Sequence, residues 1–286
     1  MARKILVVML ALTVFIAFPA FTGGRSEKAA PADAALERTP NDPRLINPGQ
    51  LTVGTGEPVY PPWMLHDDPA RGEGFENGMV YALAEELGFS RDQVVWTRGL
   101  TFDQTIAPGP KPFDFAIRQI SVTAARQQIL DFSIVYFQPD KAVVALENSP
   151  VRGARSFADL RRSRWGATIG TTDLDYLENI LGVTNVAVYD DQAGTFQALQ
   201  GGLIDATVVA LPTALYATAV QVPNAQITAL LPPDPNDTGH GLLFEQGNPL
   251  VEWINEGLRA IIDRGVIDDL IRQYLVADEG IPEITE

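Results

Sequence analysis

The most informative stretch of this sequence is residues 120–133, ISVTAARQQILDFS. Its two hydroxyl residues, Ser121 and Thr123, and its arginine, Arg126, come soon after an apolar, strand-like run, Phe113 to Ile117. An arginine can donate two parallel hydrogen bonds to a carboxylate, and hydroxyl groups can supply further donors. Such a cluster at the end of a strand indicates a site for a small carboxylic acid.

Length and composition narrow the possible functions. The chain has 286 residues, enough for one large domain or two smaller ones that each bury a core. Its formal net charge of −15 argues against a nucleic-acid partner, because basic surfaces bind phosphate backbones. The absence of cysteine excludes disulfides and thiolate chemistry. His66 and His240 are the only histidines and have no ligand spacing, so we expect no metal and no cofactor.

The N-terminus has the pattern of an export signal. Arg3 and Lys4 precede a run of fourteen residues, Ile5 to Phe18, that is apolar except for Thr13. This pattern predicts a signal peptide over residues 1–25 and therefore export. An uncleaved membrane anchor is the alternative, although the run falls short of the roughly 20 residues that a membrane span needs. Residues 26–48 are rich in Ala, Pro and acidic residues without an apolar period, which predicts a disordered tether.

Beyond residue 48, short β-branched runs alternate with helical patterns, which predicts an α/β fold. The expected strands are Leu51–Val53, Val94–Trp96, Phe113–Ile117, Ala142–Leu146, Gly166–Ile169, Val186–Tyr189, Ala206–Val209 and Leu242–Phe244. The expected helices are Gly78–Leu87, Asp173–Leu181, Gly194–Leu199, Val251–Ile261 and Val266–Leu275. Thr171 and Thr172 are suitable caps for the second of these helices.

Motifs for nucleotide binding and hydrolysis are missing. Residues 54–56 read Gly-Thr-Gly, but no third glycine follows, and residues 166–172 lack the lysine of a P-loop. No nucleophile-elbow motif is present. The adjacent acidic pairs Asp67-Asp68 and Asp190-Asp191 lie in polar stretches, and neighbouring side chains on a strand face opposite ways. We therefore interpret both pairs as solvated loop residues, and we expect no catalytic residue among them.

The order of several motifs resembles the family 3 solute-binding proteins of ABC importers, the polar amino-acid class. The resemblance covers about residues 50–276. It rests on Val53-Gly54-Thr55, Tyr60-Pro61-Pro62-Trp63, Gly74-Phe75-Glu76, Glu85-Glu86-Leu87-Gly88, Phe113-Asp114-Phe115, residues 120–133, Gly170-Thr171-Thr172 and Ala198-Leu199-Gln200 through Ile204-Asp205-Ala206. Each piece is modest alone, and their order makes the resemblance specific.

The resemblance implies the type II periplasmic-binding-protein fold, in which two α/β lobes joined by two crossover strands close on a ligand like a hinged trap. The first lobe would comprise residues 49–140 and 241–276, and the second lobe residues 141–240. Residues 277–286 would form a C-terminal tail. Such a protein is not an enzyme; it is a periplasmic or extracytoplasmic monomer that delivers its ligand to the permease subunits of an ABC importer.

The family's binding residues can be transferred position by position. In relatives, the residues matching Arg126 and Ser121 hold the ligand carboxylate from the first lobe, and amides at the positions of Thr171 and Thr172 meet it from the second. A helix start has free N–H groups that favour an anion. The aromatic positions that match the pocket wall are Tyr60, Trp63 and Phe102. For Trp63, a place in the ordinary core is an equally good interpretation.

One departure from the family concerns the other end of the ligand. Relatives usually carry an aspartate that pairs with the ligand ammonium where this chain has Ala210, and a small or neutral residue where it has Arg118, next to Gln119. The resemblance then implies an amino acid or a more anionic ligand such as a dicarboxylate. The alternative is that Arg118 points away and that Glu57 or Asp103 supplies the missing negative charge.

Two other functional classes stay open. The same fold hosts exported dehydratases that act on cyclic carboxylates such as arogenate or prephenate. Those enzymes need a general acid, for which Ala210 removes one natural place and Glu57 is a substitute. A sensor module of a kinase or receptor is less favoured, because the sequence shows no membrane-spanning or signalling segment after Leu275.

Overall fold

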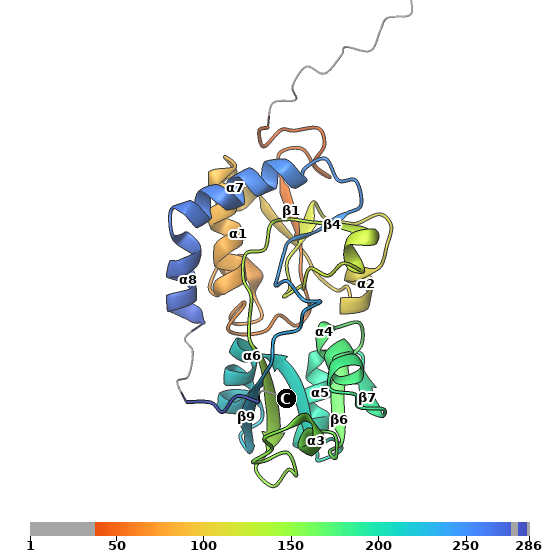
Figure 1. Cartoon of the computed structure of the whole chain (residues 1–286). Coiled ribbons are helices and arrows are strands. Elements are labelled where there is room, and N and C mark those ends of the chain that lie inside the picture. Colours follow the sequence, from red (N-terminus) through yellow and green to blue (C-terminus); the bar gives the residue numbers. More distant parts are fainter. Residues whose placement is uncertain (1–37, 276–279, 285–286) are drawn as a thin grey trace, which may run out of the picture. The chain divides into compact units, whose positions relative to one another are not determined.

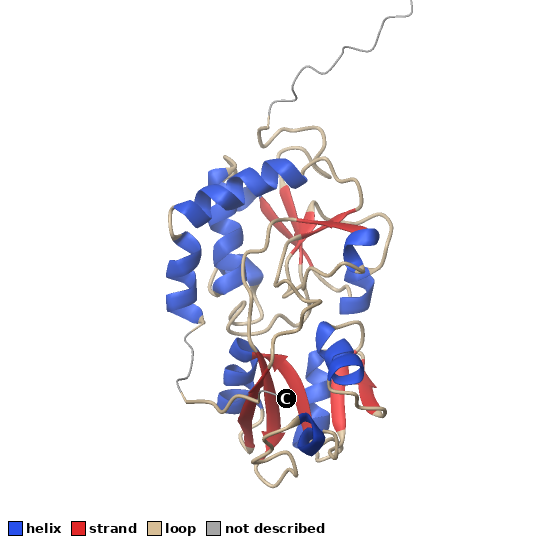
Figure 2. Ribbon diagram, in the orientation of Figure 1, coloured by secondary structure: helices blue, strands red, loops and turns tan. Residues whose placement is uncertain are grey.

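The structure, a computed structural model, describes residues 38–275 and 280–284. Within them the strands form two five-stranded sheets, drawn in red in Figure 2. In spatial order, the first sheet consists of β2 (Val94–Thr97), β1 (Leu51–Gly54), β3 (Phe115–Ala116), β10 (Leu243–Glu245) and β4 (Leu130–Phe132). Strand β1 is parallel to β2 and β3, whereas β10 is antiparallel to β3 and β4.

The helices that accompany the first sheet come from both ends of the described chain. They are α1 (Phe75–Glu86), α2 (Phe102–Ile106), α7 (Val251–Asp263) and α8 (Val266–Tyr274), with 3₁₀ turns at Pro69–Arg71, Arg91–Gln93 and Arg126–Gln128. Helices α1, α7 and α8 pack against one another, as Figure 1 shows in orange and blue. Ile254, Leu258 and Ile261 of α7 are fully buried in this core. Their helical spacing in the sequence predicts this apolar face.

The second sheet uses residues between the two parts of the first. In spatial order it consists of β7 (Val186–Tyr189), β6 (Trp165–Thr168), β8 (Ala206–Ala210), β5 (Lys141–Leu146) and β9 (Ala225–Leu231). The accompanying helices are α3 (Phe157–Leu160), α4 (Thr172–Asp175), α5 (Gln192–Gln200) and α6 (Leu211–Tyr216), with π-helical turns at Tyr176–Ile180 and Ala217–Gln221. We call the two sheets with their helices the first and second lobes.

Two chain segments connect the lobes and lie side by side. Residues 133–140 lead from β4 into β5, and residues 232–242 lead from β9 back into β10. His240 of the second segment donates to the carbonyl of Phe137 at 2.7 Å and accepts from the amide of Tyr136 at 2.9 Å. The structure therefore has the two-lobed α/β fold that the resemblance predicts.

The chain before β1 differs from the expected tether. The predicted signal peptide and the tether up to residue 37 lie outside the described residues. Residues 38–48, in contrast, form hydrogen-bonded turns, and Asp42 and Leu45 are buried. The amide of Ile46 donates to Asp114, whose other oxygen accepts from Thr52 in β1. The prediction of a disordered tether is therefore wrong for this part, because Leu45 packs into the first-lobe core, Asp42 pairs with Arg44, and the Ile46 amide binds Asp114.

The end of the described chain packs on the second lobe. Leu230 of β9 donates to Pro282, and Ile284 donates back to Leu230. The side chain of Ile284 is buried in the core of that lobe. Among residues 38–275 and 280–284, no helix has the length and apolar character that crossing a membrane requires.

Candidate ligand-binding site

A cavity of about 210 Å³ lies among residues of the two lobes and of both connecting segments. Drug-sized ligands occupy pockets of roughly 300 to 1,000 Å³, so this cavity suits a smaller solute. All but one of the predicted site residues line it: Glu57, Tyr60, Phe102, Arg118, Gln119, Ser121, Arg126, Thr171, Thr172 and Ala210. The fold thus brings together residues that lie up to about 150 positions apart in the sequence.

Arg126 is a buried cation of the cavity wall, with 8% of its surface exposed. One terminal nitrogen donates to the carbonyl of Ser121 at 2.6 Å, and the other to the carbonyl of Gly170 in the second lobe at 2.8 Å. Its guanidinium lies 5.5 Å from the ring centre of Phe102. Burial lowers the pKa of Arg126, while the nearby Asp237, Asp175 and Asp173 oppose that shift. Because both bonds go to neutral carbonyls, the positive charge is available to an anion.

Ser121 and the two threonines meet from opposite lobes. The hydroxyl of Ser121 lies 3.2 Å from that of Thr172. The Thr171 side chain caps α4 by accepting from the amide of Leu174 at 3.3 Å, as its position in the sequence predicts. These residues are at the cavity, but the Ser121 and Thr172 hydroxyls are also bonded to a carboxylate of the protein itself.

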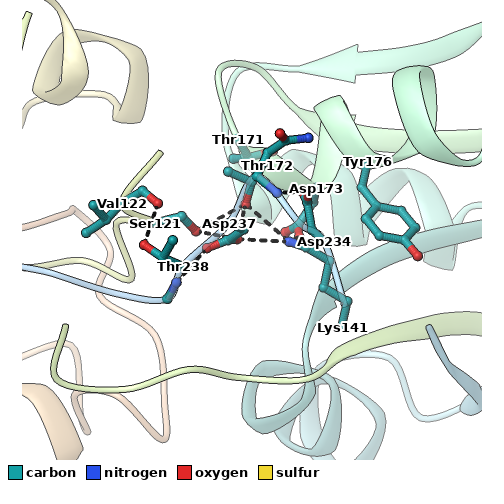
Figure 3. A network of polar contacts seen from close by, with 12 residues as sticks. Ser121, Val122, Lys141, Thr171, Thr172, Asp173, Tyr176, Asp234, Asp237 and Thr238 are labelled. Carbon is teal, nitrogen blue, oxygen red and sulfur yellow. Dashed lines mark hydrogen bonds and ion pairs between the residues drawn. The ribbon is translucent and has the colours of Figure 1, made fainter. Parts of the chain in front are cut away.

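That carboxylate belongs to Asp237, which the sequence analysis missed. Figure 3 shows it between Ser121, Thr172 and Lys141. Its Oδ2 accepts from Ser121 at 2.8 Å and from Thr172 at 3.0 Å, and Oδ1 accepts from the amide of Gly239 at 3.0 Å. Asp237 lies in a run of Pro, Asp and Asn that looks like a simple turn, so only the three-dimensional fold reveals its role.

Lys141 is the third cation of the cavity wall. Its ammonium lies 2.9 Å from Asp173 and 3.4 Å from Asp237. Burial opposes protonation, but these two carboxylates hold the pKa of Lys141 above its ordinary value. Burial would also raise the pKa of Asp237, but Lys141 and the Ser121 hydrogen bond hold it below its ordinary value. Both groups are therefore charged at neutral pH.

Arg118 reaches the cavity while anchored on the first lobe. It donates to the carbonyl of Leu100 at 2.8 Å and to the hydroxyl of Thr105 at 3.2 Å. Its guanidinium lies 5.5 Å from the ring centre of Phe102, as that of Arg126 does. Burial lowers its pKa, and Glu76 is the first of the groups that oppose this shift. Arg118 therefore does not point away from the cavity.

Ala210 ends β8 beside a cation. It pairs across the sheet with Lys141, so the position where relatives carry an acid has a lysine as its neighbour. Of the suggested substitutes, Glu57 lines the cavity but is exposed, and Asp103 is exposed on α2 and does not line it. Neither side chain therefore supplies a buried negative charge in place of the aspartate expected at position 210.

Gln119 is held in place by a buried acid. Its backbone has a φ of 54°, which is uncommon for a residue other than glycine. Glu76 accepts from the Gln119 amide at 2.8 Å and from the Tyr136 hydroxyl at 2.6 Å, and it also binds the Gln119 side chain. Burial raises the pKa of Glu76 to about 7, against the lowering effect of these hydrogen bonds. Glu76 thus fixes the position of Gln119 in the cavity wall.

Trp63 is the predicted wall residue that the structure places elsewhere. It is fully buried and packs edge-on against Phe75 and Phe137. Its indole N–H donates to the Thr213 hydroxyl of the second lobe at 2.8 Å. Trp63 therefore has the alternative role, a place in the core, and the prediction of a pocket-wall role is wrong, because Phe75, Phe137 and Thr213 enclose the ring and leave no exposed surface.

Asp190 and Asp191, interpreted from the sequence as solvated loop residues, are exposed and also line the cavity. Asp191 accepts from the amide of Gly194 at 2.7 Å and so caps α5. The other acidic pair does not line the cavity, and its Asp67 forms an ion pair with Arg98. In the described part of the chain, no group of three or more His, Asp or Glu side chains is arranged to hold a metal ion.

Three polar atoms of the cavity wall are buried without a hydrogen-bond partner among the described residues. They are the Tyr60 hydroxyl, Nε2 of Gln192 and Nδ1 of His240. Burial raises the pKa of Tyr60 above its usual range and lowers that of His240 to about 3, so both are neutral. Buried polar groups in proteins are nearly always satisfied, so these atoms favour a polar ligand.

Comparison with known proteins shows which family the chain belongs to. The family model of the bacterial extracellular solute-binding proteins, family 3, matches residues 51–277. The chain belongs to this family. Its members are extracytoplasmic solute-binding proteins, which confirms the resemblance. The L-cystine-binding protein TcyJ of Escherichia coli (strain K12) is 28% identical over 234 residues, which cover 80% of this chain and 84% of that protein.

Solved structures of such proteins share the fold. An ancestral arginine-binding protein bound to arginine matches with a TM-score of 0.64 and 26% identity, over 80% of this chain and 99% of that one. An ancestral amino acid-binding protein, described as a precursor of cyclohexadienyl dehydratase, matches with a TM-score of 0.65 over 80% and 96% of the two chains. Its identity of 23% shows the fold alone.

Proposed function

We propose that this family 3 protein is the exported receptor of an ABC importer and binds a small carboxylate ligand, an amino acid or a related organic acid. Its relatives include proteins named for binding cystine and arginine. The ligand would occupy the cavity between the lobes. The permease subunits would then recognise the closed, ligand-bound state, which ligand binding stabilises by its preference for that state.

The observation that carries the proposal is the buried Arg126 in the cavity wall. Its guanidinium has five N–H groups, and the two hydrogen bonds described above both go to neutral carbonyls. A buried cation is stabilised by an anion that arrives in bidentate geometry. We also assign Thr171 and Thr172 to the carboxylate through the main chain at the start of α4, and Ser121 through its place beside Arg126, because the Ser121 and Thr172 hydroxyls already donate to Asp237. Phe102, Tyr60 and Gln119 form the wall.

The arrangement favours binding over catalysis. A dehydratase acting on arogenate or prephenate would need a carboxylic acid that is protonated and in contact with the substrate. Asp237 lines the cavity but is held ionised, since its pKa is below the ordinary value. Glu76 has a pKa of about 7, but Gln119 and Tyr136 occupy its oxygens behind the wall. We therefore propose that the protein is not an enzyme.

A ligand screen tests the proposal. Thermal shift followed by calorimetry would use the twenty amino acids, cystine and a set of mono- and dicarboxylic acids. We expect saturable binding to at least one of these compounds with one site per chain. Binding only to ligands without a carboxylate would contradict the proposal. Incubation with prephenate, followed by the absorbance of phenylpyruvate, should show no turnover, and turnover would restore the dehydratase alternative.

A further inference from the structure

The fully buried carboxyl of Glu76, at the start of α1, joins the cavity wall to one of the connecting segments. Its Oε1 accepts from the backbone amide of Gln119 at 2.8 Å and from the hydroxyl of Tyr136 at 2.6 Å. Its Oε2 accepts from the side-chain nitrogen of Gln119. Gln119 lines the cavity, and Tyr136 lies on the segment 133–140 between the lobes. A change at this one carboxyl therefore acts on the cavity wall.

The three hydrogen bonds determine where a proton on Glu76 is placed. Oε1 faces two groups that stay donors: the backbone amide of Gln119 has no acceptor to offer, and burial raises the pKa of Tyr136 well above its ordinary value. Oε2 faces only the side-chain amide of Gln119, which carries an acceptor oxygen next to its nitrogen. A proton on Glu76 therefore lies on Oε2 and is donated to the Gln119 oxygen once that amide has turned over.

Turning the amide changes what Gln119 presents to the cavity. With Glu76 ionised, Nε2 of Gln119 is bonded to Glu76, and the amide oxygen is the atom left for the cavity. With Glu76 protonated, the oxygen is bonded to Glu76, and the two N–H groups are left for the cavity. N–H groups donate to a carboxylate, whereas an amide oxygen has no hydrogen to donate. The backbone of Gln119 stays in place, because its own bond to Glu76 is kept.

We propose that the protonation state of Glu76 regulates carboxylate binding in the cavity, because its proton turns the side-chain amide of Gln119 so that N–H groups face the ligand. The affinity for a carboxylate then rises as the pH falls, and by linkage the binding of the ligand takes up a proton. This inference rests on the proposed function, since it concerns the regulation of the same site. Glu76 acts through Gln119 and does not touch the ligand, so it is a positioning residue.

The groups around Glu76 place this change near neutral pH. Burial raises the pKa of Glu76 to about 7, against the hydrogen bonds from Tyr136 and Gln119 and the positive charge of Arg118. Helices α7 and α8 and the turns at Pro69–Arg71 and Arg91–Gln93 pack against α1. Among the described residues, no charged side chain of these elements lies within ion-pair distance of Glu76. Their arginines that lie nearest to acids at the two ends of α1, Arg71 and Arg264, pair with Glu73 and Glu86.

Three other groups of the cavity wall keep their charge between pH 6 and 8. The pKa of His240 is lowered to about 3 by burial, so this side chain is neutral. The pKa of Asp237 is held below its ordinary value and that of Lys141 above it, so both are charged. These groups therefore cannot produce the change that we assign to Glu76.

Calorimetry at pH 6, 7 and 8 tests the inference. The probe is the tightest-binding acid of the ligand screen whose own charge is constant over this range, with L-glutamine and L-arginine tried first. We expect the wild type to bind at least about threefold more weakly at pH 8 than at pH 6. Binding enthalpies measured in phosphate and in Tris at pH 7 should show that a fraction of one proton is taken up.

Two variants separate this role from a merely structural one. Glu76→Gln keeps the shape and neutrality of the protonated acid, so its affinity should be independent of pH and close to that of the wild type at pH 6. Gln119→Gly suits the φ of 54° and keeps the backbone bond to Glu76, but it lacks the amide that turns, so its affinity should also be independent of pH. Glu85→Gln, on an exposed acid of α1, is the control and should keep the wild-type profile.

Each outcome has a separate meaning. A wild type whose affinity is the same at pH 6 and 8, without proton uptake, overturns the inference even if neither variant folds. A Glu76→Gln protein that binds more weakly at every pH but keeps the wild-type pH dependence shows a structural role alone and also overturns it. A Gln119→Gly protein that keeps the dependence shows that the amide is not the route. If no acid binds at any pH, the proposed function fails, and this inference fails with it.

Discussion

The two groups of cations in the cavity differ in what they are bonded to. Arg118 and Arg126 donate to carbonyls and a hydroxyl, and neither is within ion-pair distance of a carboxylate in residues 38–275 and 280–284. Lys141 lies between Asp173 and Asp237. A buried cation with neutral partners is therefore prepared for an anionic ligand, whereas a buried cation with charged partners stabilises the protein's own structure.

The largest effect we expect is on stability, at the compensated cation. Lys141→Met should lower the free energy of unfolding by about 3 to 5 kcal/mol, because it leaves Asp173 and Asp237 buried without their ammonium. Urea unfolding at pH 7 measures this. Lys111→Met is the control on a more exposed lysine. A loss below about 1 kcal/mol for Lys141→Met would show that the two groups of cations do not differ as described.

Glu76 is the anionic counterpart of the two arginines, since its hydrogen-bond partners are neutral. Its pKa is raised by burial to about 7 from an ordinary 4.5, so the folded state binds the proton more tightly than the unfolded state. The contribution of Glu76 to the free energy of unfolding is fully present below about pH 4.5. It is lost as pH rises through about 7, and the total loss is about 3 kcal/mol. Glu76→Gln should remove this slope from urea unfolding curves recorded between pH 5 and 8. An unchanged slope would show that another group is responsible.

The uncompensated cation should affect binding more than folding. Arg126→Gln should weaken the affinity for the ligand by about 30-fold or more, which is about 2 kcal/mol. Its unfolding free energy should fall by about 1 to 3 kcal/mol, less than for Lys141→Met, because two hydrogen bonds to neutral carbonyls are lost and no carboxylate within ion-pair distance is left without its partner. Calorimetry and urea unfolding measure the two quantities. Arg272→Gln, on an exposed arginine, is the control, and a large loss of stability with unchanged affinity would reverse the assignment.

The smallest effect concerns a neutral contact between the lobes. Thr213→Val keeps the side-chain size but removes the acceptor of the Trp63 indole N–H, which is buried. The cost should be about 1 to 2 kcal/mol in unfolding free energy. Thr218→Val is the control, because its hydroxyl donates only within its own helical segment. Equal effects of the two substitutions would show that the contact between the lobes adds nothing.

Elements with a clear apolar period could be predicted from the sequence, and elements that depend on tertiary pairing could not. Strand β1 and helix α7 lie close to the predicted ranges. Strand β9 was missed because it is an edge strand with partly exposed positions that forms by pairing with β5. The predicted helix over 173–181 changes to a π-helical turn at Tyr176, where Leu181 donates five residues back.

The candidate site follows the same rule. Arg126 was found because its neighbours in the sequence carry a recognisable pattern. Asp237 bonds to Ser121 across 116 positions, so no local pattern could connect them. Its short polar run predicts only a turn, and the contact exists because the returning connecting segment pairs with residues 120–122. The direction of Arg118 likewise depends on acceptors in the 100–105 region that the fold brings near.

A crystal structure with the ligand found in the screen tests the central claim most directly. We predict that the ligand carboxylate lies within about 3 Å of the Arg126 guanidinium nitrogens, in the bidentate geometry of charge-assisted hydrogen bonds. A ligand carboxylate bound elsewhere, with no contact to Arg126, would contradict the account.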